Sequence, residues 1–508
     1  MDVACLLSIL QLTPEKVAAV EPILSQFHAL KDCEKNDRRL ATTETVFPLV
    51  FGEDASVRTD PHFSERNNTV WSLNCQLTPG VIVVPRTSED VGKVLALCRG
   101  LDVKFSVRGG GHLQNPGFTS NEDGVVISMK NFKAVTVSED QSKAEIGAGL
   151  TWLEVYRELE PHGVAVTGGR VPSVGVPGLL LGGGLSFQKG KYGLSCNGVV
   201  EYEIVLADST IVKANANENK DLFWALRGGG SNFGIVTKFT MTTVSNKVWA
   251  EGRVFAPTEN NKLFEALMRF HQDAEKDTNA SLIFNSVQEA TLLVFIYAEH
   301  ADKRPAVFDA FEGVDFVAQM VPGNNYTIFQ IVNGFESVTA TEPKNHDMRT
   351  MSSLPDLEVY NAASECRYQQ EEVIKDIPGA KITFTLQPIS SNAIRTTNAG
   401  AGSPLGITAK AHQWFLLMTE WTNQEDEATV RDAARKIIDA AEVVAKKNGT
   451  FLDFKYANYS SRDQDPQSTY GDTNLAKLKD VARKVDPSGV FQNLQHGGWL
   501  VSRTGNKE

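Results

Sequence analysis

Apolar and polar positions along the chain repeat with two periods, and the period changes from one segment to the next. Runs of apolar and β-branched residues at 81–84, 105–108 and 125–127 predict short strands. After the first run, Thr87 is a typical N-cap residue, and apolar positions recur at helical spacing over 91–98. A strand, a helix and two further strands are therefore expected to follow one another in this region.

The same two periods continue along the rest of the chain. Val3–Leu10 predicts the start of an amphipathic helix. A longer helix is well marked, because Asn423 is a good N-cap, acidic residues follow it, and Lys446, Lys447 and Gly449 stand at its other end. Shorter helices are predicted at 153–159 and 221–226, and further strands at 134–137, 143–146, 199–207, 210–213, 234–243, 281–284, 291–297, 381–386 and 413–421. This mixture predicts an α+β fold.

Composition and charge limit the class of protein. The chain has 508 residues, of which 42% are hydrophobic and 22% charged, as in ordinary globular proteins. Its net charge of -12 disfavours nucleic acid as a partner, since phosphates attract basic proteins. No apolar run reaches the roughly 18 to 20 residues of a membrane span, so we expect no membrane partner.

Signals for the cellular compartment point in two directions. The run Val3–Leu10 follows an acidic residue and lacks a basic segment and a small-residue cleavage site, which favours a helix over a signal peptide and a cytoplasmic location. Five Asn-x-Ser/Thr sequons would matter if the protein were instead secreted, at Asn67, Asn279, Asn325, Asn448 and Asn458. Secretion stays open as the alternative.

The six cysteines are scattered and include no Cys-x-x-Cys pair. We therefore expect no metal site, and buried free thiols are the simplest interpretation. If the chain is exported, a disulfide between Cys33 and Cys98 is conceivable.

Glycine is concentrated in one segment of the chain. More than half of the 40 glycines lie between Gly100 and Gly234, including three triplets that begin at Gly109, Gly182 and Gly228. None of these runs forms Gly-x-Gly-x-x-Gly or ends in Gly-Lys-Ser/Thr, which excludes Rossmann and P-loop fingerprints. Successive backbone N–H groups in such loops can bind a pyrophosphate, whereas the alternative is a set of tight turns.

Several motifs in this order resemble one known family. They are Arg108-Gly109-Gly110-Gly111-His112, Gly168-Gly169-Arg170, Leu181-Gly182-Gly183-Gly184 and Arg227-Gly228-Gly229-Gly230. The chain resembles the berberine-bridge-enzyme-like flavoproteins of the vanillyl-alcohol-oxidase or PCMH superfamily. Within it, the chain is most similar to fungal FAD-linked oxidoreductases of secondary metabolism that are similar to 6-hydroxynicotine oxidase. The resemblance extends from Trp71 to Gln492.

This resemblance implies a PCMH-type FAD-binding domain that is split in sequence around an α/β substrate domain with an antiparallel sheet. We expect an N-terminal helical segment at 1–74, the FAD-binding domain at 75–247, the substrate-binding domain at 248–450 and a C-terminal segment at 451–508 that returns to the flavin. In the last segment, Lys455–Tyr459 resembles the family's strand against the isoalloxazine ring.

The resemblance also implies FAD attached covalently through His112. In the family, the histidine that ends this motif is joined to the flavin 8α carbon, which raises the flavin potential. Some relatives add a link from a cysteine, but Val171 occupies that position here, so His112 is expected to be the only link. The residues expected to bind the cofactor are Arg108, Gly109, Gly110, Gly111, His112, Leu113, Gln114, Gly117, Gly168, Gly169, Val174, Gly175, Gly178, Gly182, Gly183, Gly184, Gly234, Ile235, Val236, Tyr456 and Asn458.

Val174 matches the family position that influences access of O2 to the flavin, and Gly169 matches the small residue beside it. The pair predicts an oxidase. Pro177 stands where relatives often have glycine and removes one N–H that a phosphate could use.

The catalytic proton acceptor is harder to assign. Some relatives use a carboxylate or a tyrosine from the substrate-domain sheet, and the matching strand at 413–421 is largely apolar. Glu420, His412 and Tyr456 are the catalytic candidates, and a packing or strand-end role is the alternative for each. Such a strand suits a hydrophobic, aromatic or polyketide-like substrate.

These features predict an FAD-dependent oxidase of a small, largely apolar natural-product intermediate in fungal secondary metabolism, with hydride transfer to flavin N5 and reoxidation by O2 to H2O2. The alternative is a cyclase of the same fold, for a Diels–Alder or oxidative cyclisation in the same kind of pathway. The expected partners are the small-molecule substrate and O2, and the protein is expected to be a monomer or a homodimer.

Overall fold

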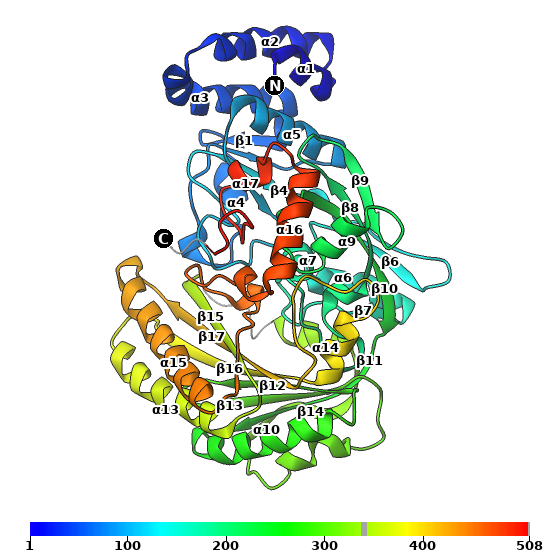
Figure 1. Cartoon of the computed structure of the whole chain (residues 1–508), viewed down its shortest axis with the longest axis vertical. Coiled ribbons are helices and arrows are strands. Elements are labelled where there is room, and N and C mark those ends of the chain that lie inside the picture. Colours follow the sequence, from blue (N-terminus) through cyan, green and yellow to red (C-terminus); the bar gives the residue numbers. More distant parts are fainter. Residues whose placement is uncertain (337–342, 506–508) are drawn as a thin grey trace.

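The structure is a computed structural model that describes residues 1–336 and 343–505. At the N-terminal end, α1 (Val3–Leu10), α2 (Pro14–Ala29) and α3 (Asp32–Phe51) form a helical layer. This layer is seated on α5 (Ser88–Leu101) through α1, and Figure 1 shows it at one end of the molecule. The predicted amphipathic helix at Val3–Leu10 is confirmed, with Leu6 and Leu10 buried.

The first sheet positions the glycine-rich motif. Its strand order is β1-β2-β4-β3, and its parallel strands are β2 (Val81–Val83), β4 (Val125–Ser128) and β3 (Phe105–Arg108). The edge strand β1 (Ala55–Val57) pairs antiparallel to β2. Because β3 ends at Arg108, the triplet Gly109–Gly111 leaves the carboxyl edge of a parallel strand.

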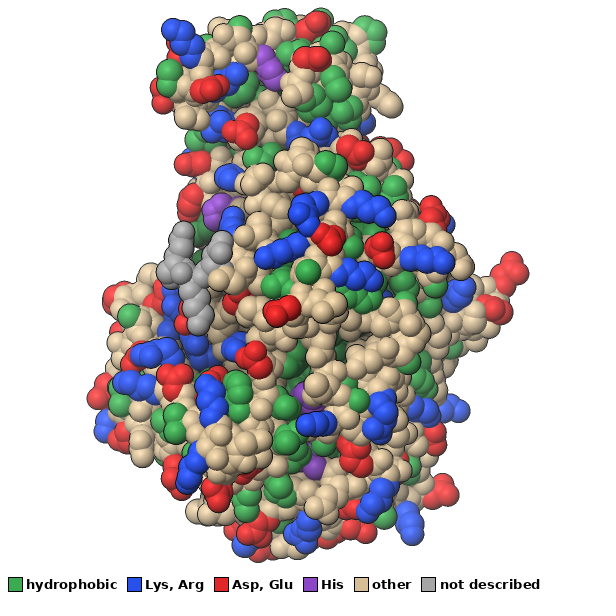
Figure 2. Space-filling model, viewed as in Figure 1, with side chains coloured by type: hydrophobic (Ala, Val, Ile, Leu, Met, Phe, Trp, Pro, Cys, Tyr) green, Lys and Arg blue, Asp and Glu red, His purple; other side chains and the backbone are tan. Residues whose placement is uncertain are grey.

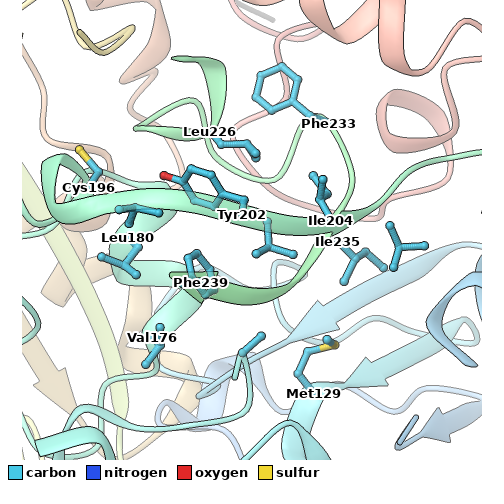
Figure 3. Close-up of a cluster of buried hydrophobic side chains, with 14 of the residues drawn as sticks. Met129, Val176, Leu180, Cys196, Tyr202, Ile204, Leu226, Phe233, Ile235 and Phe239 are labelled. Atoms are coloured by element: carbon cyan, nitrogen blue, oxygen red, sulfur yellow. The ribbon is translucent and has the colours of Figure 1, made fainter. Parts of the chain in front are cut away.

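The second sheet shares one hydrophobic core with the first sheet. The order is β5-β6-β10-β8-β9, with β7 also paired to β10. The strands are β5 (Val135–Val137), β6 (Lys143–Gly147), β7 (Val164–Val166), β8 (Val199–Val205), β9 (Ile211–Asn215) and β10 (Ile235–Ser245). The helices are α4 (Phe63–Asn67), α6 (Trp152–Leu159), α7 (Val176–Leu181), α8 (Lys189–Tyr192) and α9 (Lys220–Leu226). Figure 3 shows Val176 and Leu180 of α7 in one apolar cluster with Phe239 of β10, which fixes the loop before α7.

The third sheet is antiparallel and has the order β14-β11-β13-β12-β16-β17-β15-β18. Its strands are β11 (Lys247–Phe255), β12 (Ala280–Ser286), β13 (Thr291–Tyr297), β14 (Ala318–Thr327), β15 (Asn345–Ser353), β16 (Lys381–Ile389), β17 (His412–Trp421) and β18 (Phe451–Leu452). Figure 1 shows α10 (Asn260–Ala274), α13 (Leu357–Ile374) and α15 (Glu427–Lys447) on one side of this sheet. The remaining helices are α11 (Ile328–Gly334), α14 (Ser391–Asn398), α16 (Asp472–Val485) and α17 (Val490–Asn493).

The two faces of β17 differ in burial. Phe415, Leu417 and Trp421 point toward the helix-covered face and are fully buried in its core. On the opposite, inner face, Leu416 is 9% exposed and Met418 is partly exposed. Side chains alternate between the faces of a strand, so the inner face turns toward the first two sheets, where Trp414 joins their core.

The α+β class and the PCMH-type arrangement of the fold are confirmed, and two local predictions need correction. Asn423 precedes a 3-10 turn at Gln424–Asp426, and α15 begins only at Glu427, because Asp426 takes the N-cap position. Lys455–Tyr459 is not a strand, since Ala457–Tyr459 forms a 3-10 turn that the Ser460 hydroxyl closes by donating to the Tyr456 carbonyl at 3.1 Å.

All six cysteines are free thiols, so the conceivable Cys33–Cys98 disulfide is absent. Cys98 is fully buried on α5 whereas Cys33 is exposed. No helix in the described ranges is long and apolar enough to cross a membrane. On the face in Figure 2, acidic and basic side chains are interspersed.

The difference between the two faces of β17 predicts a difference in stability between adjacent leucines. Leu417→Ala is expected to lower the free energy of unfolding by about 2 to 5 kcal/mol, because it leaves a cavity in a close-packed core. Leu416→Ala is expected to cost clearly less, since Leu416 belongs to neither buried cluster. Urea denaturation of both variants measures the difference, and equal losses would show that the inner face is packed as tightly as the outer one.

Candidate functional site

Arg108, which directly precedes the glycine triplet, anchors the start of this loop by hydrogen bonds. Its guanidinium is buried and donates to the carbonyl oxygens of Thr119 at 3.0 Å and Arg66 at 2.9 Å, and to the Thr69 hydroxyl at 2.9 Å. Burial without a carboxylate partner lowers the pKa of Arg108 to about 10. These contacts with protein oxygens fix the start of the loop.

The loop at Gly109–Gly111 touches the loop before α7 backbone to backbone. A Cβ atom at Gly110 would lie 2.5 Å from the Gly175 nitrogen, and a Cβ atom at Gly175 would lie 2.4 Å from the Gly110 nitrogen. Gly111 has a φ of +64°, and its carbonyl accepts a hydrogen bond from the Trp71 N–H at 2.9 Å. Glycine is required at these positions because no side chain fits between the two loops.

This loop fits the diphosphate of a dinucleotide. Within the described part of the chain, the backbone N–H groups of Gly110, Gly111, His112 and Leu113 donate no hydrogen bond. Four successive unused donors on a rigid loop form a concave site for an anion. Gly178, three residues after Gly175, borders open space, since a Cβ atom there would meet nothing within 4 Å.

Other glycines in the glycine-rich segment allow close contacts between parts of the protein. Binding of a ligand does not explain why these positions are glycine. Cβ atoms at Gly168 and Gly169 would lie 2.0 Å and 2.3 Å from atoms of the Trp152 ring. A Cβ atom at Gly182 would lie 2.0 Å from Oδ1 of Asn458. Gly183 and Gly184 have positive φ angles of +106° and +87°. The clustering of glycine therefore has two causes, close packing of the chain and the approach of a ligand.

His112 ends the loop and forms a stack with two further aromatic rings. Its ring lies 4.4 Å from that of Trp71, at 13° between planes, and Trp71 lies 3.8 Å from His346 at 21°. The Nε2 atom of His112 is 3.2 Å from the Ser173 hydroxyl oxygen. The ring also hydrogen-bonds the backbone of His112 itself, so its described contacts are with Ser173, its own backbone and the ring of Trp71.

Burial lowers the pKa of His112 and of His346 to about 4. A positive charge on His112 would also disfavour one on His346, which lowers the pKa of His346 further. Both imidazoles are therefore neutral at physiological pH, and His112 keeps a lone pair on one ring nitrogen.

Glu420, one of the three catalytic candidates, lies at the His346 end of the sheet. Its Oε2 atom is 3.9 Å from Nε2 of His346 and 3.7 Å from Nζ of Lys344. His346 and Glu420 face each other across β15 and β17. Glu420 is partly exposed. It is the candidate that a series of contacts connects to His112, because Glu420 lies beside His346, His346 stacks on Trp71, and Trp71 stacks on His112.

His412 lies at the opposite end of β17, eight residues or roughly 26 Å of strand from Glu420. Its Nε2 atom is 2.9 Å from the Thr408 carbonyl oxygen, and its Nδ1 atom accepts from Nε1 of Trp414 at 3.5 Å. Burial lowers its pKa to about 4. Both ring nitrogens are occupied, so the structure separates His412 from Glu420 and engages it in packing.

Tyr456 anchors the C-terminal segment to the glycine loops. Its hydroxyl oxygen accepts hydrogen bonds from the Gly184 N–H at 2.9 Å and from Nδ2 of Asn458 at 3.0 Å. The ring stacks on Trp414 at 4.9 Å, and burial raises the pKa of the phenol. These contacts favour a structural role for Tyr456 beside the loop.

The remaining predicted cofactor residues surround the same loops. Gln114 is buried and donates to the Ser460 carbonyl at 3.0 Å, and the Gly117 carbonyl oxygen is 3.1 Å from Nδ1 of His496. Gly234, with φ +155°, leads into Ile235 and Val236 at the start of β10. Val174 is partly exposed beside Gly175.

Sequence reasoning did not place Trp71 and His346 in the site. Trp71 was only the start of the matched region, and His346 lies in a strand with no motif around it. A third addition is Arg170, which stands inside a matched motif and donates to Gln387 and Tyr459. Trp71 and His346 are far apart along the chain, and so are Arg170 and its two partners. Only the fold brings each of these sets together.

Comparisons with known proteins agree with this geometry. A family model described as an FAD binding domain matches residues 79–215. Over 464 residues the chain is 35% identical to an FAD-dependent monooxygenase of Arthrobotrys oligospora, which covers 91% of this chain and 90% of that protein. The chain belongs to the family of FAD-linked oxidoreductases of which this relative is a member.

Solved structures of a BBE-like protein and of two flavin-dependent oxidases share the fold of this chain. The wild-type BBE-like 1 protein of Physcomitrella patens has a TM-score of 0.77 at 21% identity and covers 91% of this chain and 99% of its own. For 6-hydroxy-D-nicotine oxidase of Arthrobacter nicotinovorans the TM-score is 0.72, with 21% identity and coverage of 88% and 98%. Glucooligosaccharide oxidase of Acremonium strictum, described with a 6-S-cysteinyl, 8α-N1-histidyl FAD, has a TM-score of 0.73, 19% identity and coverage of 91% and 99%.

The contact between the two loops predicts the effect of adding one methyl group. Gly175→Ala is expected to lower the melting temperature and the flavin bound per chain, because the new Cβ atom forces Gly110 away. Gly334→Ala is the matched control, since a Cβ atom there meets nothing within 4 Å. Calorimetry and flavin absorbance measure both effects, and a Gly175→Ala protein that matched the control would contradict the described contact.

The buried histidines predict a loss of stability in mild acid. His112, His271, His346 and His412 have pKa values lowered from 6.5 to about 4, so below pH 6.5 the unfolded chain binds protons that the folded chain does not. The free energy of unfolding is therefore expected to be fully present above pH 6.5 and to fall as the pH drops toward 4.

Urea denaturation at pH 7 and pH 5 tests this dependence. The difference between the two pH values is expected to shrink in His412→Gln and to stay the same in His300→Gln, which replaces an exposed histidine. Equal stability of the unsubstituted protein at both pH values would show that these histidines are not held neutral.

Proposed function

We propose that this FAD-dependent oxidoreductase attaches FAD through Nδ1 of His112 alone and oxidises a small, largely apolar natural-product intermediate of fungal secondary metabolism with O2. The observation that carries the proposal is the neutral His112 ring, which keeps a lone pair on one nitrogen and lies beside four backbone N–H groups that donate no hydrogen bond. The histidyl linkage of glucooligosaccharide oxidase supports the choice of Nδ1, and Val171 leaves the chain without the cysteine of a second link.

When bound, FAD supplies hydride acceptance at N5 and returns the electrons to O2 as H2O2. The loop at Gly110–Leu113 would hold the diphosphate, and Ser173 and Trp71 keep the His112 ring in one orientation. Leu416 and Met418 offer an apolar surface to the substrate on the inner face of β17. Among the predicted bases we propose Glu420, because His412 and Tyr456 are committed to other hydrogen bonds.

The name of the Arthrobotrys oligospora relative favours monooxygenation as a second candidate function. An oxidase releases one H2O2 for each O2 consumed, whereas a monooxygenase transfers one oxygen atom to the product. Measuring both quantities on apolar alcohols, amines and phenols separates the two. Conversion of a substrate without O2 uptake would instead support the cyclase alternative.

The attachment predicts that flavin stays with the denatured chain. Acid precipitation of the purified protein is expected to leave the flavin absorbance in the pellet, and His112→Ala is expected to release it to the supernatant, because the bond to the chain is lost. His300→Ala, at an exposed position, is the control and is expected to behave like the parent. Flavin that is always soluble would refute the covalent link, and a chain that never binds flavin would refute the proposed function.

A further inference from the structure

Arg170 connects the glycine loops to the inner face of the third sheet. It follows Gly168–Gly169, and its Nη1 atom donates to Oε1 of Gln387 on β16 at 2.8 Å. Its Nη2 atom donates to the hydroxyl oxygen of Tyr459 at 2.9 Å. Two anchors from different parts of the chain therefore hold the guanidinium in one place.

The positive charge of Arg170 has no carboxylate partner among the described residues. Gln387 and Tyr459 offer neutral oxygens, which orient a guanidinium but do not neutralise it. The nearby Lys189 adds a second unpaired basic group, 2% exposed, whose Nζ atom donates to the Ser281 hydroxyl. Burial and the charge of Arg170 lower the pKa of Lys189, so the positive charge at this place is that of Arg170.

Arg170 also has donors to spare. A guanidinium carries five N–H groups, and two of them are used here. The others lie on a side chain that is partly exposed. A planar, fixed guanidinium with free donors matches the two oxygens of a carboxylate or the single oxygen of an enolate or phenolate.

The surface next to this guanidinium is apolar. Gln387 faces Trp414 across β16 and β17, and Leu416 and Met418 continue the same face of β17. A ligand on this face would place an apolar body against the strand and one charged oxygen at Arg170. Pockets of this kind bind mostly through apolar contact and use a few polar groups to fix orientation.

We propose that Arg170 binds an oxygen anion of the substrate, which is therefore an apolar molecule carrying one carboxylate, enolate or phenolate. This inference rests on the proposed function of the same site. It narrows the substrate class from any apolar intermediate to an acidic one, and it gives Arg170 the task of orienting that molecule over the inner face.

The test compares two probes of the same shape, 2-naphthoate and 2-naphthamide, in titrations of the flavin-loaded protein followed by flavin absorbance. Naphthoate is expected to bind about ten-fold more tightly or better, since a hydrogen bond to a charged group is stronger than a neutral one. In Arg170→Met this ratio is expected to fall to about one. Arg435→Met, which removes an arginine from the exposed side of α15, is the control and is expected to keep the ratio.

A second pair of variants covers the case in which Arg170→Met does not fold. Gln387→Leu and Tyr459→Phe release the guanidinium from its anchors and keep its charge, so both are expected to weaken naphthoate more than naphthamide. Equal weakening of the two probes would overturn the proposal.

Two other results would also overturn it. An unchanged ratio in folded Arg170→Met means that the guanidinium does not bind the anion. A lowered flavin content or reduction potential with the ratio intact means that Arg170 acts on the flavin and not on the substrate. Flavin absorbance of the parent, read before any titration, reports separately on the proposed function.

Discussion

The close approach of the Gly110 and Gly175 backbones is the constraint on which the site depends. Two loops, one from the end of β3 and one before α7, meet at distances that admit no side chain. Each loop is fixed from behind, the first by the buried Arg108 and the second by the apolar anchors of α7 in Figure 3. This contact is made by backbone atoms without hydrogen bonds, so the N–H groups of Gly110–Leu113 have no acceptor in the described part of the chain.

The C-terminal segment joins this loop region to the third sheet. Tyr456 accepts from the Gly184 N–H, Gln114 donates to the Ser460 carbonyl, and Arg170 reaches both Tyr459 and Gln387. A small set of hydrogen bonds thus sets the distance between the cofactor loops and the inner face of β17. Catalysis depends on such distances, since the reacting atoms of substrate and cofactor have to be held about 3 to 3.5 Å apart.

Burial determines which groups in the site carry charge. His112 and His346 are neutral because water is excluded around them, and this leaves a nucleophilic ring nitrogen at the end of the loop. Arg170 keeps its charge with neutral partners only. A neutral His112 and a guanidinium without a carboxylate partner are the two features on which the proposed attachment and the proposed acidic, largely apolar substrate rest.

The sequence was sufficient for the elements with strong local signals. The β3 strand running into Gly109, the helix ending at Lys446 and Lys447, and the strand at 413–421 all follow from local patterns. Trp71 and His346 could not be found in this way, because their contact joins residues 275 positions apart and no spacing rule connects them. The family resemblance implies a strand at Lys455–Tyr459, whereas this chain forms a 3-10 turn there, which the side-chain hydrogen bond from Ser460 to the Tyr456 carbonyl stabilises.

Hydrogen–deuterium exchange of the loop amides tests the central claim most directly, in the His112→Ala protein with and without added FAD. The account predicts that the amides of Gly110–Leu113 exchange rapidly without FAD, because they donate to no protein group, and become protected when FAD binds. Exchange at these amides that FAD leaves unchanged, while FAD demonstrably binds, would contradict the account, since the cofactor would then be held by some other part of the chain.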